Sequence, residues 1–572
     1  MGLQIWLPLN GSFDNKGLMN TKLTTPANYS GWSTISKIGT KGFTNGTITM
    51  DAETTGKIYN NKEMTFAFWF YANGADGTST GNCIIGNGGM SGSNNRKFAI
   101  FNYQTINDLH WSWQNDGIEG GTNGTVAVGG SKNDSLPSYK WTHVIFAYKN
   151  PTMTLYINGK AVATSTGIVN NATYEYSTPI LNLNSYQIVN DLRIYDNCLS
   201  AKEAAELARG LVGHWPLHNN YDCMPNILTN GSTEISSAAY NTQIYYTESA
   251  PVAGEVYTLT MCVTPAPGVT HFSPYLSAGY RSAGNITVSG TDTQIVTHTF
   301  TAAYYSGREP SVSPSYGYIY IYRFPKEGIT GESIIHWAKL EKGNKATSFC
   351  PHSSETPQGN KVYDCSGYEN HGSIYGSPTI NNDSIRHNCC TAFSGSQAIN
   401  CGRGAMVTDE ITVNLWVYLD DWANFNNNIR AISCTEGGGW NIESYGHFPC
   451  YAGGAYQIAK GNFQSASPGW HMITGMFDGF QSRIYLDGVL KASSTALSTK
   501  TPITYHSANS IFIGAEAAGS ASTPTSPYFT GKISDVRIYA TALSEADLLE
   551  LYQVPVSIDE NGGIYGYNFK EV

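Results

Sequence analysis

The chain has 572 residues, a formal net charge of −10 and only 13% charged residues, together with 60 Gly and 38 Tyr. This length exceeds what one hydrophobic core supports, so we expect several domains. Lys and Arg are sparse and form no basic cluster, which argues against a nucleic-acid partner. A composition so rich in Gly and Tyr favours many short strands joined by tight turns.

The N-terminus and the cysteines both predict synthesis without export. Residues 1–6 have neither the basic stretch nor the apolar core of a secretory signal, and no apolar run is long enough to span a bilayer. The 11 cysteines are an odd number at irregular spacings, which favours free thiols in a reducing compartment. Cys389 and Cys390 lie near His387 without a CxxC pair, so we expect buried cysteines rather than a zinc site.

The first 210 residues contain a series of strand signals that ends in a helix signal. Residues 66–70 alternate Phe with other residues at the period of two expected of a strand with one buried face. Asn158-Gly159 is a type I′ turn dipeptide, which predicts a two-residue hairpin. Ser200 and Glu203 have the spacing of a capping box, which predicts a helix from residue 200 onward. The expected strands include residues 5–10, 64–71, 141–144, 155–157 and 190–195.

The same signals recur in the same order later in the chain, so the sequence contains an internal repeat. The turn glycine follows the strand tryptophan by 18 positions in both copies, from Trp141 to Gly159 and from Trp470 to Gly488. Four blocks match, which makes chance an implausible explanation. The second-copy blocks are residues 213–218, 411–418, 470–489 and 534–544.

These blocks resemble the laminin-G-like, concanavalin-A-like lectin/glucanase family, in particular its bacterial and phage branch. That pattern contains an opening W-x-L strand, a DxSGxxNHG loop, a D-x-R-[IV]-Y strand and an LS-x-x-E helix. Residues 364–372 carry the loop nearly intact, whereas residues 13–18 of the first copy depart from it. The resemblance covers roughly three quarters of the chain and implies two β-sandwiches.

In the second copy, a segment of roughly 140 residues separates the opening strand from the DxSG loop. A domain inserted at an exposed loop is tolerated because its two ends lie close together. Its last phrase, residues 335–347, resembles the W-x-K-L-E-x-G-N-x-A-T ending of carbohydrate-binding-module-like jelly rolls in phage tail and baseplate proteins. Residues 557–569 look like a hairpin that turns at Asn561-Gly562, and similar tails end laminin-G-like proteins of phages and prophages.

The expected fold class is therefore all-β, with two concanavalin-A-like (laminin-G-like) sandwiches and an inserted β-sandwich or jelly roll. The expected domains are the first sandwich (1–210), the opening strand of the second (211–222), the inserted jelly roll (223–354), the remainder of the second sandwich (355–553) and a C-terminal hairpin (554–572).

Motifs of catalysis occur only in unsuitable contexts. Retaining glucanases carry E-x-D-x-x-E on a strand, which places two carboxylates in a cleft. Here Glu545, Asp547 and Glu550 follow the capping residue Ser544, so we expect a helix on which they point apart. Gly77 to Gly81 matches G-x-S-x-G without the strand and helix that a nucleophile elbow needs. We therefore expect no catalytic residues.

The candidate binding residues are aromatic side chains in two loop-like segments and in the inserted module. Glycans are bound by exposed aromatic faces beside polar side chains, which predicts carbohydrate-binding roles for Trp111, Trp113, Trp422, Tyr304, Tyr305 and Tyr316. Strand tryptophans such as Trp69 and Trp416 are expected in the core. No cofactor is expected. The resemblance leaves calcium at the sandwich rim as an alternative, since many members of the family hold one ion there, and Asp364, Asp420 and Asp421 are the available carboxylates.

The leading hypothesis is a non-catalytic structural protein of a bacteriophage particle: a tail fibre, head fibre or decoration protein on the virion surface. Its expected partners are other virion proteins, host surface polysaccharide and further copies of itself, with no nucleic acid and no membrane insertion. Synthesis in the host cytoplasm and release on lysis explain an adhesion-type protein without an export signal. The alternatives are a bacterial surface lectin or adhesin, and a glycoside hydrolase with an unrecognised carboxylate pair.

Overall fold

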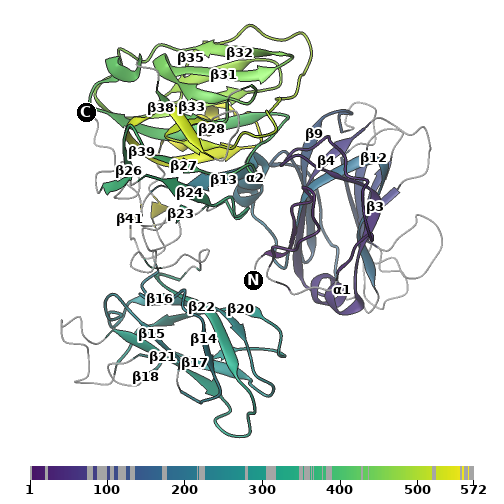
Figure 1. Cartoon of the computed structure of the whole chain (residues 1–572). Coiled ribbons are helices and arrows are strands. Elements are labelled where there is room, and N and C mark those ends of the chain that lie inside the picture. The colour runs from purple at the N-terminus through teal and green to yellow at the C-terminus, as the bar shows by residue number, and fades with distance from the viewer. Residues whose placement is uncertain are drawn as a thin grey trace.

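Strands dominate the structure, and the expected all-β fold class is confirmed. Figure 1 shows three lobes, of which the upper two are the repeated sandwiches and the lower one is the inserted module. The computed structural model describes the chain apart from residues 1–2, 18, 20–22, 74–81, 87–98, 104–107, 114–123, 129–135, 171–176, 216, 218–225, 242, 277–280, 305–316, 345, 347–351, 353–360, 363, 365, 377, 382–389, 427–428, 436, 518–522, 554–556, 559–563 and 566–572.

The first sandwich pairs a large sheet with a small one around a common apolar core. The large sheet has the order β11 (Lys160–Ser165), β10 (Thr152–Ile157), β9 (Trp141–Lys149), β4 (Glu63–Ala72), β12 (Thr178–Tyr195), β3 (Phe43–Met50) and β2 (Leu23–Thr24), with β1 (Leu3–Leu7) also on β12. The small sheet is β5 (Asn82–Gly86), β6 (Ala99–Tyr103), β7 (Asp108–Trp113) and β8 (Gly124–Val128). The helices are α1 (Ala52–Tyr59) and α2 (Ala201–Arg209).

The second sandwich repeats this plan with a larger second sheet. Its first sheet is β25 (Thr379–Asn381), β26 (Cys390–Ser394), β39 (Thr530–Tyr539), β28 (Ile411–Leu419), β33 (Gly469–Phe477), β34 (Ser482–Leu486) and β35 (Val489–Ser493), with β13 (Leu211–Trp215) on β39. The other sheet is β23 (Lys361–Val362), β24 (Gly372–Tyr375), β27 (Ala398–Asn400), β36 (Phe512–Ile513), β29 (Arg430–Ser433), β30 (Asn441–Glu443), β31 (His447–Ala452) and β32 (Ala455–Lys460). A hairpin of β37 (Ala515–Ala517) and β38 (Pro524–Tyr528), helix α3 (Glu545–Tyr552), and the 3-10 turns η2 (Trp422–Asn426) and η3 (Ser444–Gly446) complete it.

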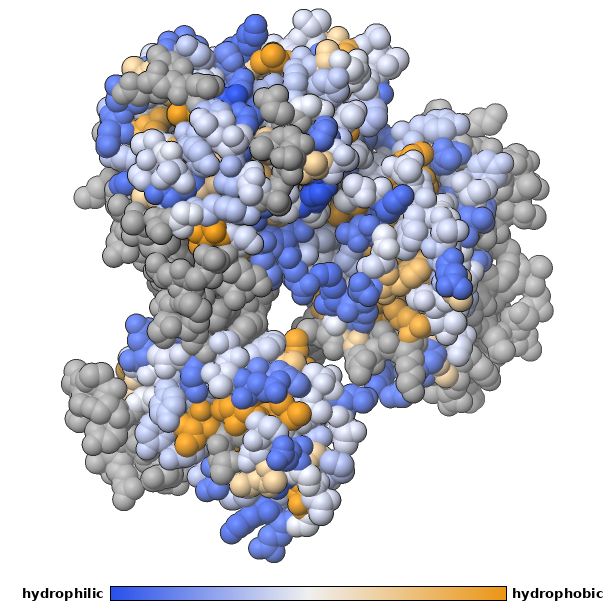
Figure 2. All heavy atoms as spheres, viewed as in Figure 1, coloured by the Kyte–Doolittle hydropathy of each residue, from blue (hydrophilic) through white to orange (hydrophobic). Residues whose placement is uncertain are grey.

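The segment between β13 and β23 forms a β-sandwich with a core of its own. One sheet is β14 (Ile235–Ser237), β22 (Ser333–Lys342), β16 (Val256–Thr264) and β20 (Gln294–Thr301). The other is β15 (Gln243–Tyr246), β21 (Tyr318–Phe324), β17 (His271–Leu276) and β18 (Arg281–Ser282), with β19 (Ile286–Thr287) also on β17. Figure 2 shows an open gap bordered by this inserted module and the sandwiches, and a continuous apolar strip across the face of the module that is in view.

The turns and caps of the repeat form as the sequence predicts. Asn158 and Asp487 have φ of 48° and 53°, and the glycines that follow them are also positive, as a type I′ hairpin requires. Ser200 and Ser544 each form a complete capping box, with Glu203 and Asp547 respectively. Both helices therefore begin where the serine replaces a missing backbone partner.

The D-x-R block of the repeat is a structural device. Asp191 and Asp535 have φ of 56° and 51°, at bulges where the pairing register of β12 and β39 shifts. This backbone turns each carboxylate inward, where Asp191 accepts hydrogen bonds from Trp6 Nε1 and Arg193 Nε. Asp535 accepts a hydrogen bond from Arg537 Nε in the same way and lies 2.9 Å from Nε2 of His214 on the opening strand β13. The motif thus ties the opening strand to the central strand of each sheet.

The two sandwiches share an apolar junction, because Trp6, Trp69, Trp141 and Ile188 of the first belong to one buried cluster with the core of the second. We call this contact the junction. The DxSG loop of the second sandwich reaches into it: Tyr368 packs on Trp6 with ring centroids 4.9 Å apart. The Tyr368 hydroxyl accepts a hydrogen bond of 3.1 Å from Arg193.

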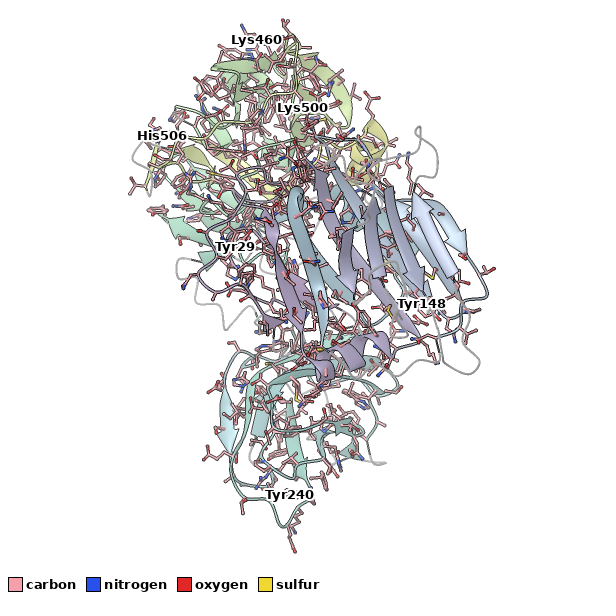
Figure 3. All side chains as sticks on the ribbon, turned by 90° about the vertical axis from the view of Figure 1, so that its right-hand side faces the viewer. Tyr29, Tyr148, Tyr240, Lys460, Lys500 and His506 are labelled. Carbon is pink, nitrogen blue, oxygen red and sulfur yellow. The ribbon has the colours of Figure 1, made fainter. Side chains whose placement is uncertain are left out.

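Charged groups surround the apolar part of the junction. Lys37 of the first sandwich is only 2% exposed, and its Nζ lies 3.1 Å from Asp409 and 3.5 Å from Glu410 of the second. Lys500 binds the same two carboxylates at 2.8 Å. Figure 3 shows Lys500 near the place where the two sandwiches meet. The two lobes are therefore held together by both burial and ion pairs.

The last strands, β40 (Ser557–Ile558) and β41 (Ile564–Tyr565), pair antiparallel, while the expected turn at Asn561-Gly562 lies outside the described residues. Among the residues that the structure describes, no helix is long and apolar enough to cross a membrane.

Candidate functional site

Trp422 does not lie on the surface as the sequence suggested. The polar run around it folds into η2, and the indole turns inward until only 1% of the residue is exposed. Its ring packs against Phe425 and Phe463, and its Nε1 donates a hydrogen bond to the Gly469 carbonyl. The expectation that Trp422 stacks on a sugar is therefore corrected: the side chain belongs to the core.

Tyr304 is also a packing residue, since it is 8% exposed and its hydroxyl donates a hydrogen bond of 2.6 Å to the Pro251 carbonyl. Its expected role in binding is therefore corrected in the same way. Trp111 and Trp113 lie in strand β7 rather than in a loop, and their side chains are outside the described residues. Tyr305 and Tyr316 lie outside the described residues too, as does the segment from Gly77 to Gly81.

A row of aromatic side chains covers the outer side of the β15-β21-β17 sheet of the inserted module. Strand β21 alternates strictly: Ile319 and Ile321 are fully buried, whereas the residues between them face outward and are half-buried. The register of β17 and β15 brings further rings to the same side. We call this surface the aromatic face; its members are Tyr240, Tyr246, His271, Tyr275, Tyr318, Tyr320, Tyr322 and Phe324.

The rings of the aromatic face are in contact from one end to the other. The distances between neighbouring centroids range from 4.5 Å for Tyr275–Tyr322 to 6.5 Å for Tyr246–Tyr318, within the range of favourable aromatic pairs. His271 and Phe324 stack almost parallel, with an angle of 4° between their planes. Each ring therefore fixes its neighbour, and the face is organised before any ligand arrives.

The aromatic face also has polar groups. Lys326 Nζ lies 5.7 Å from the centre of the Tyr240 ring, close enough for a cation–π contact. Burial raises the pKa of Tyr322 and of Tyr240, so these phenols are protonated and able to donate hydrogen bonds at neutral pH. Figure 3 shows Tyr240 at the end of the inserted module that points away from the sandwiches.

The sequence contained the signal for this face. Residues 318–324 alternate Tyr or Phe with Ile or Arg. This alternation predicts a strand, but either of its two faces is apolar enough to be the buried one. The partner strands decide this. Ile319 and Ile321 join the core of the module, which leaves the tyrosines outside.

The E-x-D-x-x-E run lies on helix α3, as expected. Arg209 binds two of its carboxylates, with Nη2 2.9 Å from Asp547 Oδ1 and a further contact to Glu550. Partial burial would raise the pKa of Asp547, but hydrogen bonds from Ser544 and Arg209 outweigh it and lower the pKa. Asp547 therefore serves the helix cap, and Asp547 and Glu550 together hold helix α3 against Arg209 of helix α2.

A second group of acids surrounds Arg430 of strand β29, with Glu443 on strand β30 and Glu516 on strand β37. Glu516 is 4% exposed and lies 2.8 Å from Arg430 Nε, while Glu443 lies 3.0 Å from Arg430 Nη2. Thr435 donates a further hydrogen bond to Glu516. Both carboxylates are thus bound to one guanidinium.

The carboxylates considered for calcium have other contacts. Asp364 is buried and accepts hydrogen bonds from the backbone of His214, Ser366 and Asn370 and from the Ser366 hydroxyl, so its oxygens already have donors. Asp420 and Asp421 are exposed at the end of β28. Within the described part of the chain, no group of three or more His, Cys, Asp or Glu side chains is placed to hold a metal ion.

Comparison with known families agrees with this architecture. The family model described as "Concanavalin A-like lectin/glucanases superfamily", of laminin-G type, matches residues 40–205 and 393–549, which together are more than half of the chain. The chain belongs to this superfamily. Both of its matching segments fall in the repeated sandwiches, so this concanavalin A-like protein has a lectin-like fold in two copies. No curated protein matches the sequence.

Several solved structures are similar to parts of this concanavalin A-like protein. Domain 4 of a Geobacillus stearothermophilus arabinanase, solved with arabinotriose, is 19% identical with a TM-score of 0.25, over 33% of this chain and 92% of its own. The receptor-binding domain of a botulinum neurotoxin C/D mosaic is 11% identical with a TM-score of 0.29, over 60% of this chain and 97% of its own. A Trypanosoma rangeli sialidase is 11% identical with a TM-score of 0.26, over 36% of this chain and 32% of its own.

Proposed function

We propose that the chain is a non-catalytic glycan-binding protein of a bacteriophage particle, and that the aromatic face of the inserted module contacts host surface polysaccharide. The observation that carries this proposal is the contiguous row of eight rings, seven on one sheet and Tyr240 beside it. Sugar rings present C–H groups that pack on aromatic faces, while phenol and lysine groups bind their hydroxyls. The position of the face at the free end of the module suits contact with a large polymer.

The absence of catalysis is part of the proposal. Its support is that the acids around Arg209 and Arg430 are held in ion pairs, whereas a general acid needs a carboxyl group that keeps its proton near the working pH. The virion location and assembly with further copies and other virion proteins rest on the likeness of the inserted module's ending and of the C-terminal tail to phage proteins.

We expect the variant Tyr320→Ala/Tyr322→Ala to bind polysaccharide at least about thirtyfold more weakly, since two central contact residues are worth about 2 kcal/mol or more together. The measurement is retention of the purified chain on an array of bacterial surface polysaccharides, followed by affinity measurement on the glycans that retain it. Both side chains point outward, so the module should keep its thermal stability.

The matched control is Tyr139→Ala/Tyr186→Ala, which removes two tyrosines that are 65% and 40% exposed on the first sandwich. This control should bind like the parent chain. Equal losses in both variants, or none in either, would remove the aromatic face from the proposal. New reducing ends on any glycan would overturn the non-catalytic assignment.

The particle assignment has a separate measurement, which is mass spectrometry and immunogold labelling of particles released from a lysed host culture. Labelling of the particle surface supports the proposal. Labelling of the bacterial envelope alone favours the surface lectin instead.

A further inference from the structure

The two sandwiches carry an equivalent pair of aromatic residues on the outer side of their larger sheets. Tyr71 lies opposite Trp141 on strands β4 and β9, with ring centroids 5.3 Å apart. Tyr418 lies opposite Trp470 on strands β28 and β33, with centroids 5.6 Å apart. The two pairs occupy matching positions of the internal repeat.

In the first sandwich this pair is used for packing. Trp141 is 4% exposed and belongs to the cluster shared with the second sandwich, and Tyr71 packs against the same cluster. The neighbour of Tyr71 on strand β12 is Ile188, which is 2% exposed. An apolar row of this kind is what the junction between the sandwiches requires.

In the second sandwich the equivalent row is open and polar. Lys532, not an isoleucine, lies opposite Tyr418 on strand β39, and its Nζ is 4.2 Å from the centre of the tyrosine ring. Strand β28 is followed by Asp420 and Asp421, both exposed, at positions where the sequence of the first sandwich has Asn73 and Gly74. Charged side chains are depleted from the centres of protein interfaces. The row of the second sandwich therefore suits a polar ligand better than it suits docking against another sandwich.

A cleft of about 800 Å³ opens beside this row. Its walls include Tyr418, Tyr528, Pro527, Asp420, Asp421 and Lys532, contributed by β28, β38, β39 and the turn after β28. This volume is in the range of small-molecule sites. The cleft thus combines aromatic and proline surface with carboxylate acceptors and an ammonium donor, as recognition of a hydroxyl-rich ring requires.

We propose that this cleft is a second saccharide site, separate from the aromatic face, and that it takes one or a few neutral hexose or N-acetylhexosamine units. The C–H face of a sugar packs on Tyr418 or Tyr528, while Asp420 and Asp421 accept its hydroxyl hydrogens and Lys532 donates to a ring or hydroxyl oxygen. The site goes beyond the proposed function, because it does not depend on the inserted module or on a virion.

The test uses the full chain labelled with 5-fluorotryptophan and a panel of methyl glycosides of neutral hexoses and N-acetylhexosamines. Trp470 contacts Tyr418, so its fluorine resonance, assigned with Trp470→Phe, reports on the cleft. We expect at least one glycoside to shift this resonance in a saturable manner at millimolar concentration. The same shift should persist in Tyr320→Ala/Tyr322→Ala, which separates this site from the aromatic face.

The substitutions that test the cleft are taken from the equivalent positions of the first sandwich. Asp420→Asn and Lys532→Ile install residues of the first sandwich at the equivalent positions, and together they should weaken the saccharide at least tenfold. Lys491→Ile, at an exposed position of strand β35 in the same sandwich, is the matched control and should leave binding unchanged.

Three results would overturn the inference. No glycoside of the panel shifts the Trp470 resonance, or the shift never saturates, or it survives in the Asp420→Asn/Lys532→Ile variant. Sedimentation gives an independent check: self-association of the parent chain that disappears in Tyr418→Ala would assign the row to docking of a second copy instead.

Discussion

Replacing Lys37 with methionine should lower the free energy of unfolding of the joined sandwiches by about 3 kcal/mol, because removing one member of a buried ion-pair network leaves its partners without full compensation. Burial raises the pKa of Asp409 and Glu410, but Lys37 and Lys500 outweigh it and hold both pKa values below their usual range. Methionine keeps the length of the side chain beside Trp69, so the change isolates the charge.

Unfolding in urea measures this effect without screening the ion pairs. The control is Lys57→Met, which removes an exposed pair with Glu53 on helix α1 and should cost at most about 0.5 kcal/mol. Adding Asp409→Asn and Glu410→Gln to Lys37→Met should recover part of the lost free energy of unfolding, because the carboxylates that have lost an ion-pair partner are then neutral. A change in Lys37→Met no larger than that of the control would contradict the assignment.

The variant His143→Met should make the first sandwich markedly less sensitive to acid. Burial lowers the pKa of His143 from 6.5 to about 3, against the Asp191 charge, which raises it, and the Arg193 and Lys37 charges, which lower it further. The unfolded chain therefore takes up a proton first, and stability present above pH 6.5 is lost as the pH falls toward 3. The loss is about 1.4 kcal/mol per pH unit, or about 2 kcal/mol between pH 7 and pH 5.

Methionine is the residue at the equivalent position of the second sandwich. Met472 lies opposite Trp416 in the second sandwich as His143 lies opposite Trp69 in the first, so methionine is a residue that this environment accepts. Thermal unfolding followed from pH 7 to pH 4 should give stability curves that diverge as the pH falls, with the parent chain losing more. Parallel curves would show that folding leaves the pKa of His143 unchanged, and would contradict this prediction.

Local features of the fold were predictable because they depend on residues close in sequence. The turn at Asn158-Gly159 needs two positive φ values, and the cap at Ser544 needs an acceptor for Asp547 N–H. The turn depends only on its two residues and the cap only on the first turn of the helix, so both can be predicted from the local sequence. The repeat then extends the prediction to both sandwiches.

The candidate site was harder to predict because exposure depends on distant partners. Trp141 and Trp470 occupy the same position of the repeat, yet one is buried in the junction and the other borders an open row. Trp422 lies in a polar run, but Phe425 and Phe463 draw it into the core. Sequence periodicity identifies a strand, whereas the packing of whole domains decides which of its side chains meet solvent.

The two connections of the inserted module have a mechanical consequence. The chain enters the module after β13 and returns before the DxSG loop, and the two points are joined because His214 N–H donates a hydrogen bond of 2.8 Å to Asp364. A force applied at the free end of the module is thus divided between two tethers, one held by β13 in the first sheet and the other leading through β23 of the other sheet. We expect the module to resist being peeled away under tension, since β13 and the loop must yield together rather than in succession.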